Sequence, residues 1–385
     1  MTASGADPGS RLRLLHLAEG DDTSGYFPQL ARFHDRSRYQ MGFATLKPMA
    51  PWLRDFMQDQ GVDCWSLACR TRAAYASGLA RLALGLRRRR IDVLHTHLFD
   101  PSVVGLAAGT LARTPLRVLT RHHSDYHTRI GKRWHVRLDQ LTTRLSHVVI
   151  AVSRHTAEHL IEREGAPRDK VRVVLNGIDF ERVRVSRPDA PARLRAELAQ
   201  GADHLLLIAA RLHPEKGYET LLAALPLLRP RVAGPVRLLI AGTGQLEGAY
   251  RALAATLGCA DSVSFLGFRR DLPDLIAAAD LFVLPSLAEA FGLVLAEALY
   301  LGTPVVATRV GGIPEIVDHG VDGVLMPPND SESLAQALAE LLTDAPRRAR
   351  LAGAGRDKVA ARFGFETMVR RYEAIYAERL GHGAA

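Results

Sequence analysis

The chain has 385 residues, of which 47% are hydrophobic and 24% charged, and it carries a formal net charge of +9. This length and composition exclude a disordered chain and a single small domain, and they favour two globular domains. The most apolar stretch, residues 281–307, contains Glu289 and Glu297, and charges in mid-bilayer are costly, so it is not a membrane span.

Short apolar runs alternate with longer helix-like segments along the first half of the chain. Most of the runs are continuous Val, Ile and Leu segments, which is typical of parallel strands buried on both faces. Strands that alternate with helices indicate crossover units and a doubly wound α/β sheet. The predicted strands are residues 13–17, 39–45, 92–95, 116–120, 147–152 and 171–175.

A second series of the same kind fills the rest of the chain, with strands predicted at 205–210, 236–242, 262–266, 281–284, 304–307 and 323–326. The charged segment 181–191 contains Pro188 and Pro191 and is a plausible linker. The last segment, 366–380, has apolar residues at helical spacing. The sequence therefore predicts domains at 1–185 and 186–365 and a helical segment within 366–385.

Two carboxylates, Glu289 and Glu297, lie on either side of the point where a predicted helix begins after Gly292. Ligands in open α/β sheets bind beyond the carboxyl ends of the strands, so both carboxylates could contact one extended ligand. The backbone N–H groups of Phe291, Gly292 and Leu293 would form an anion site at the start of this helix. The alternative is an ordinary helix-start acid together with a surface acid.

Arg211 and Lys216 flank a turn between the predicted strand 205–210 and a predicted helix at 218–228. A departing nucleotide diphosphate gains negative charge, so cations preorganised there stabilise the transition state more than the ground state. Arginine can hold two phosphate oxygens, and lysine acts as a point charge. By themselves the two residues would be interpreted as solvated cations, but the neighbouring glutamates favour a phosphate site.

A glycine turn at residues 242–248 resembles the dinucleotide-binding fingerprint, but its spacing is G-x-G-x-x-x-G. Asp261 precedes the next predicted strand, whereas a ribose-binding acid should end it. We therefore interpret Gly242 as a point of close approach to a nucleotide. An NAD-dependent oxidoreductase is disfavoured.

Histidines gather after two predicted strands of the first half: His95 and His97 after one, and His122, His123 and His127 after the other. The spacing of His95 and His97 puts both rings on one face, which raises the question of zinc. No cysteine or acid accompanies them and no Asp-x-Asp motif occurs, so we predict no metal. His122 is predicted to position an acceptor or bind a sugar hydroxyl, and a structural role is equally expected for His95.

The charge is unevenly distributed: residues 1–185 hold 29 Lys and Arg against 18 Asp and Glu, a net +11, and residues 186–385 have a net −2. This asymmetry predicts an anionic partner for the first half: a membrane surface, an acidic acceptor or a nucleic acid. Arg87 to Arg90 end a predicted helix at 75–86 that could lie on a lipid surface, although packing of this helix on its own sheet is favoured. Nucleic acid is disfavoured because no aromatic residues interleave the charge.

The three cysteines, Cys64, Cys69 and Cys259, match neither a zinc site nor a disulfide framework. The polar N-terminus is not followed by the apolar core of a signal peptide. A cytoplasmic location is therefore expected.

Jointly, these residues resemble glycosyltransferase family 4, a family of retaining enzymes with the GT-B fold. The resemblance is densest over residues 171–307. Its motifs are Asn176-Gly-Ile-Asp179, Arg211 with Lys216-Gly217, Glu289 with Phe291-Gly292 and Glu297, and Gly311-Gly-Ile-Pro-Glu315. It implies an acceptor-binding and a donor-binding Rossmann-like domain facing a central cleft, with the last helix crossing back to the first domain.

The resemblance also implies roles for individual residues. Arg211 and Lys216 are expected to contact the diphosphate, Glu289 the hexose and Glu297 the ribose. The base is expected to lie near Gly242 and Phe268. The histidine that the family carries in its N-terminal domain corresponds to His122. The family's Gly-Gly loop corresponds to residues 19–26, where only Gly25 is in a similar place.

The implied reaction is a front-face substitution that moves a hexose from a UDP- or GDP-sugar to a hydroxyl acceptor in glycan, glycolipid or polysaccharide biosynthesis. No cofactor or metal is expected, and the acceptor could be lipid-linked or anionic at the cytoplasmic face of a membrane. The alternatives are a nucleotide-sugar epimerase of the same fold and a non-catalytic nucleotide-sugar-binding module. A phosphorylase is disfavoured because no pyridoxal-lysine context is found.

Overall fold

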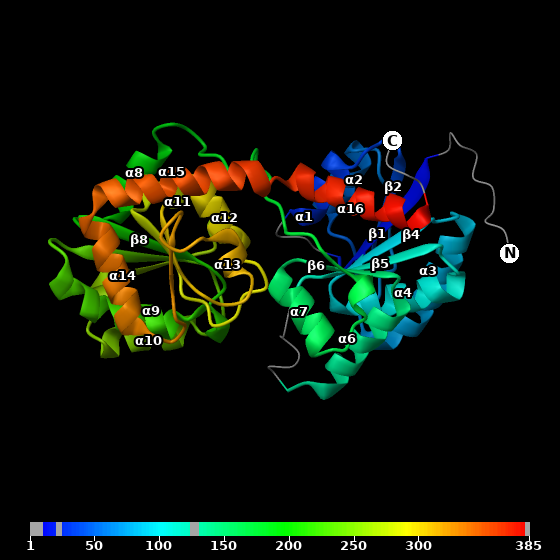
Figure 1. The fold of residues 1–385 in the computed structure, drawn as a ribbon, viewed down its shortest axis with the longest axis horizontal. Coiled ribbons are helices and arrows are strands. Elements are labelled where there is room, and N and C mark those ends of the chain that lie inside the picture. The colour runs from blue at the N-terminus through cyan, green and yellow to red at the C-terminus, as the bar shows by residue number, and fades with distance from the viewer. Residues whose placement is uncertain (1–10, 21–24, 124–130, 382–385) are drawn as a thin grey trace. The chain divides into compact units, whose positions relative to one another are not determined.

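The computed structural model describes residues 11–20, 25–123 and 131–381, which form two α/β units (Figure 1). The first unit runs to Leu175 and includes the chain from Phe365 onward, and the second is Asn176–Gly364. The division therefore differs from the predicted boundary at residue 185. The reason is that the segment before residue 185 is bonded into the second unit: the N–H of Ile178 donates to the carbonyl of Phe363 (2.8 Å).

The first unit contains a seven-stranded parallel sheet in the order β3-β2-β1-β4-β5-β6-β7. Its strands are β1 Leu12–Ala18, β2 Tyr39–Thr45, β3 Asp63–Ser66, β4 Val93–His97, β5 Leu116–Arg121, β6 Val148–Ala151 and β7 Val171–Val173. The sequence analysis missed β3, because this edge strand has four residues and none of them is fully buried. The strand order reverses direction between β1 and β4, which makes this pair the switch point of the sheet.

Helices cover both faces of the first sheet (Figure 1). One face packs against α1 Tyr26–Phe33, α2 Pro51–Asp59 and α16 Phe365–Leu380. The other side holds α3 Tyr75–Arg88, α4 Phe99–Ala112, α6 Arg133–Leu145 and α7 Arg154–Glu162. The apolar side chains of α3, Leu82, Ala83 and Leu86, lie in the core. This helix therefore packs on its own sheet, as the favoured interpretation has it.

The second unit contains a six-stranded parallel sheet in the order β10-β9-β8-β11-β12-β13. Its strands are β8 His204–Ala209, β9 Val236–Ala241, β10 Val263–Gly267, β11 Leu281–Leu284, β12 Val305–Thr308 and β13 Val324–Met326. Each predicted strand of this series is present to within one or two residues, since most of them are buried apolar runs. The switch point lies between β8 and β11.

The second sheet is likewise covered on both faces (Figure 1). One layer consists of α9 Tyr218–Leu228, α10 Glu247–Thr256 and α14 Ser331–Thr343. The remaining helices are α8 Ala190–Leu198, α11 Leu272–Ala278, α12 Leu293–Tyr300, α13 Ile313–Ile316 and α15 Ala345–Arg362. Within the described ranges, no helix combines the length and the apolar character that a bilayer crossing requires.

Candidate active site

The two neighbouring strands at the switch point of the second sheet each deliver a charged residue. Lys216 lies in the loop after β8 and Glu289 in the loop after β11, and 2.5 Å separates Nζ of Lys216 from Oε2 of Glu289. Both side chains are largely buried, with 15% and 16% exposed. The structure thus brings together two predicted site residues at the edge where open α/β sheets bind ligands.

A glycine lets the two loops approach each other. Gly217 has φ 68°, and a Cβ at this position would lie 1.9 Å from the carbonyl oxygen of Pro285. The loops are also joined by a hydrogen bond from the N–H of Leu287 to the carbonyl of Glu215 (2.7 Å). A side chain at 217 would therefore force apart the loop that carries Lys216 and the loop that carries Glu289.

The turn after β12 supports Glu289 from its other side. A Cβ on Gly311, whose φ is 54°, would lie 1.7 Å from the carbonyl oxygen of Glu289, and the N–H of Gly312 donates to that oxygen (3.0 Å). The hydroxyl of Ser286 lies 3.5 Å from Oε2 of Glu289. The Gly-Gly turn at 311–312 therefore has a definite structural role, which is to hold the backbone of Glu289.

Arg211 follows β8 directly and is exposed. Within the described part of the chain, its side chain forms no hydrogen bond or ion pair. Lys216 is held by a carboxylate, whereas Arg211 is open to a ligand. The loop after β8 therefore combines a fixed cation with an unengaged one, which suits a ligand with several anionic oxygens.

The helix that carries Glu297 begins where it was predicted. Gly292 caps α12 with φ 101°, Leu293 is its first residue, and the side chain of Phe291 is buried, so Phe291 offers a ligand only its backbone. Burial raises the pKa of Glu297 to about 7, and the positive charge of Arg182 opposes this rise. Near neutral pH the carboxyl of Glu297 can therefore act as a donor or as an acceptor toward a hydroxyl.

Gly242 and Phe268 follow β9 and β10, which are neighbours in the sheet. The N–H of Gly242 donates to the carbonyl of Gly267 (2.7 Å), and a Cβ on Gly242 would lie 2.0 Å from the carbonyl oxygen of Ala210. Phe268 is 70% exposed and presents its ring to solvent. The predicted site residues of the second unit thus follow four adjacent strands of one sheet, from β10 to β11.

In the first unit, three histidines form a hydrogen-bonded row. Nδ1 of His16, on β1, is 3.0 Å from Nε2 of His97, on β4, and Nδ1 of His97 is 3.2 Å from Nε2 of His122, just after β5. Burial lowers the pKa of His122 to about 4 and that of His16 to about 3, so both rings are neutral. The sequence analysis missed His16; the available signal was a single polar residue inside an apolar strand.

His95 has a different environment from His97. Its Nδ1 lies 2.6 Å from the hydroxyl of Tyr376, on α16, and its Nε2 lies 2.6 Å from the hydroxyl of Thr120. Ring nitrogens of His16, His95 and His97 lie within 4.8 Å of one another. Both nitrogens of His95 and of His97 are engaged in hydrogen bonds, so in this structure the rings form a hydrogen-bond network.

Gly25 caps α1 with φ 72°, and the next residue, Tyr26, meets the ring of His122 edge-on with 5.2 Å between centroids. Residues 21–24 of the predicted loop 19–26, and His127, lie outside the described residues. The part of the loop that is described thus ends beside the histidine row.

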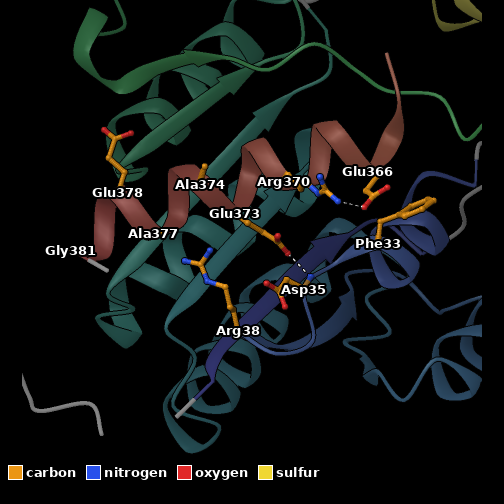
Figure 2. Close-up of a pocket in the computed structure, with 10 residues that line it drawn as sticks. All are labelled: Phe33, Asp35, Arg38, Glu366, Arg370, Glu373, Ala374, Ala377, Glu378 and Gly381. Atoms are coloured by element: carbon orange, nitrogen blue, oxygen red, sulfur yellow. Dashed lines mark hydrogen bonds and ion pairs between the residues drawn. The ribbon is translucent and has the colours of Figure 1, made fainter. Parts of the chain in front are cut away.

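A hollow of about 860 Å³ lies elsewhere in the first unit, between α16 and the loop after α1 (Figure 2). Figure 2 shows Glu373 pointing to the loop, where it accepts a hydrogen bond from the N–H of Asp35 (2.8 Å). Burial raises the pKa of Glu373 to about 7. None of the predicted site residues lines this hollow, and its lining mixes carboxylates with arginines.

Two family descriptions match the chain. Residues 192–358 match Glycosyl transferases group 1, and residues 29–182 match Glycosyltransferase Family 4. The first match covers the Lys216–Glu289 pair and Glu297, and the second covers His97 and His122.

Curated relatives and solved structures agree with these matches. An uncharacterized glycosyltransferase of Methanocaldococcus jannaschii is 30% identical over 74% of this chain and 75% of its own length. A D-inositol 3-phosphate glycosyltransferase of Thermobispora bispora is 34% identical over 80% and 75%. The crystal structure of Anabaena HepE in complex with UDP-glucose superposes with a TM-score of 0.80 at 25% identity, covering 96% of this chain and all of that one.

Proposed function

This chain belongs to the group 1 glycosyltransferases, and on that premise we propose that it transfers a hexose from a nucleotide diphosphate sugar to a hydroxyl acceptor, with retention of the anomeric configuration. Membership confirms the predicted family, and the structural neighbours confirm the GT-B fold. The observation that carries the proposal is the Lys216–Glu289 pair at the switch point of the second sheet.

The proposed mechanism assigns a role to each group at this edge. Arg211 and Lys216 bind the diphosphate and stabilise the charge that builds on it as the bond to the sugar breaks. Glu289, held by its cation and by the turn at Gly311, accepts hydrogen bonds from hexose hydroxyls. Glu297 bonds the ribose hydroxyls, with Gly242 and Phe268 near the base. The departing phosphate takes the proton of the acceptor hydroxyl.

The donor is proposed to be a UDP- or GDP-sugar. The bound UDP and UDP-glucose of the Anabaena neighbour support a uridine donor. No metal is proposed to bridge the diphosphate, since two cations and the start of α12 supply the positive charge. His122 is proposed to contact the acceptor or a sugar hydroxyl.

An anionic acceptor or an anionic membrane is proposed for the basic first half of the chain. The net +11 of residues 1–185 supports this, and the Thermobispora relative is named for an acceptor that carries a phosphate. We place the enzyme in the cytoplasm, in contact with the inner face of a membrane, in glycan, glycolipid or polysaccharide synthesis.

The test is incubation with a panel of UDP- and GDP-hexoses, with and without hydroxyl acceptors that include inositol phosphate and a lipid-linked sugar. Release of UDP or GDP with formation of an α- or β-linked product of the same configuration as the donor supports the proposal. Interconversion of the donor with no transfer indicates an epimerase. Donor binding with no turnover of any kind indicates a binding module, and no binding of any nucleotide sugar contradicts the proposal.

A further inference from the structure

The row of three histidines joins the end of β4 to the loop after β5 through the switch point of the first sheet. His97 contacts His16 with one ring nitrogen and His122 with the other, at 3.0 and 3.2 Å. Among the residues that the structure describes, nothing else hydrogen-bonds to a ring nitrogen of His122. Within those residues, Nδ1 is therefore the ring nitrogen of His122 that has no hydrogen-bond partner.

Neutral rings restrict the protons in such a row. A neutral imidazole carries one N–H, so one nitrogen donates and the other accepts. If Nε2 of His97 donates to His16, its Nδ1 must accept from Nε2 of His122, and Nδ1 of His122 is an acceptor. If His16 donates to Nε2 of His97, then Nδ1 of His97 donates to His122, and Nδ1 of His122 carries the proton. The outer nitrogen of His122 thus has opposite roles in the two arrangements.

We propose that His97 and His16 are positioning residues for His122: the row fixes the ring orientation of His122 and determines whether its Nδ1 accepts or donates a hydrogen bond. Among the described residues, His16 hydrogen-bonds to His97 and not to His122, so it would act on His122 through His97. The significance of this control for transfer rests on the proposed contact between His122 and the substrates. The effect of the row on the orientation and tautomer of His122 does not depend on that contact.

The surroundings of the row argue against a role in packing alone. His16 lies on β1 between Leu15 and Leu17 and is 2% exposed, and His97 is fully buried. Apolar side chains of similar shape could pack in these places, but they would leave Nε2 of His122 without the partner that His97 provides, so packing alone does not account for the imidazoles. Tyr26 contacts both His97 and His122 edge-on, with centroids 5.7 and 5.2 Å away, and so confines the rings.

The direct test is nuclear magnetic resonance of the full chain labelled with ¹⁵N-histidine, because protonated and unprotonated ring nitrogens have distinct shifts. His122→Gln identifies the signals of His122. We expect one tautomer in the unaltered protein and a mixture in His16→Leu. We expect His16→Asn, whose amide can bond where Nδ1 lies, to restore a single tautomer. Unchanged His122 signals in folded His16→Leu would overturn the proposal.

His95 provides the matched control. Its ring is as buried as that of His97 and lies beside it, with 4.2 Å between centroids, but its nitrogens bond to Tyr376 and Thr120. His95→Leu should lower stability and leave the signals of His122 unchanged. An equal shift of these signals in His95→Leu would mean general repacking and would also overturn the proposal.

Kinetics test the consequence for the reaction. His16→Leu should lower kcat by up to about tenfold, as expected for one lost hydrogen bond, with little change in KM for the donor. In the His122→Gln background the same change should have no further effect, because the row then has nothing to position. Additive losses would overturn the proposal. If no transfer is found with any donor, the resonance experiment still decides the inference, and only the proposed function fails.

Discussion

Lys216 and Glu289 are 73 positions apart in the chain, and their side chains form an ion pair in which Nζ lies 2.5 Å from Oε2. The pair exists because β8 and β11 are neighbours at the switch point of the second sheet. Arg211, in the same loop as Lys216, has no ion-pair or hydrogen-bond partner for its side chain among the described residues. This difference between the two cations leads to the first prediction.

Arg211→Ala and Lys216→Ala should each raise the activation free energy by about 2–4 kcal/mol, which corresponds to a loss of about 30-fold to 10³-fold in turnover. Their effects on folding should differ. Lys216→Ala should also lower the free energy of unfolding by about 1–3 kcal/mol, since it leaves Glu289 without its partner. Arg211→Ala should not. Steady-state kinetics and urea titrations measure the two quantities, and turnover within threefold of the unaltered enzyme in both variants would refute the assignment.

Gly311→Ala should disturb Glu289. The added Cβ would sit 1.7 Å from the carbonyl oxygen of Glu289, so the two turns must separate, at a cost of about 3 kcal/mol in unfolding free energy. Gly320→Ala is the matched control, because Gly320 has a similar positive φ of 78° but open space around it. It should lose only about 1–2 kcal/mol and keep its activity. Equal losses of stability and activity in the two variants would contradict this account.

Glu297→Gln should change how stability depends on pH. The pKa of Glu297 is about 7 in the folded protein and 4.5 as its ordinary value, so the folded state holds a proton that the unfolded state releases. The free energy of unfolding therefore falls as pH rises from about 4.5 to 7, and above 7 the fold contains a buried carboxylate. We expect the variant to be more stable than the parent at pH 8, with the gain disappearing at pH 5. Melting temperatures of both proteins across this pH range provide the measurement. A gain in stability that does not depend on pH would contradict the prediction.

Most strands were predictable because they contain an apolar run, as Leu281–Leu284 illustrates. β3 was not, because Asp63–Ser66 is a short edge strand that lacks such a run. The division into two compact units differs from the predicted boundary for a related reason. Prolines and charges in segment 181–191 look like a linker, but backbone hydrogen bonds far apart in the sequence, such as Ile178 to Phe363, assign the preceding residues to the second unit.

The placement of the candidate site residues of the second unit at one edge of the sheet was predictable. Each of them follows a recognisable strand, and parallel strands end on the same side of a sheet. What the sequence could not provide was the pairing of Lys216 with Glu289, which depends on strand order. The same limit applies to His16. A lone histidine in an apolar strand has no motif, and its contact with His97 requires β1 to lie next to β4.

Transfer activity should survive chelation. The sequence contains no Asp-x-Asp motif, and Arg211, Lys216 and the start of α12 supply the positive charge that a diphosphate needs. The measurement is the initial rate after dialysis against EDTA, compared with the rate after addition of Mg²⁺ or Mn²⁺. Complete loss on chelation with recovery on adding either ion would contradict the prediction and would require a new search for metal ligands.

The basic end of α3 is expected to bind anionic lipid through two of its four arginines. Arg87 donates to the carbonyl of Leu111 (2.5 Å), and Arg89 contacts Asp63 (3.3 Å) and lies over the ring of Trp65. Arg88 and Arg90 are exposed, and within the described residues their side chains have no such partners. The apolar face of α3 is buried in its own core, so it cannot insert into a bilayer.

Binding should therefore be electrostatic. Each near-surface cation contributes about 1 kcal/mol, and salt screens the attraction. Co-sedimentation with vesicles, with and without anionic lipid and at low and moderate salt, measures it. Arg88→Gln with Arg90→Gln should weaken binding without loss of stability. The matched pair, Arg87→Gln with Arg89→Gln, should weaken binding less and lower stability, because those two side chains already contact the protein. No binding to any anionic vesicle at low salt would exclude a membrane, and a soluble anionic acceptor would then account for the charge of the first half of the chain.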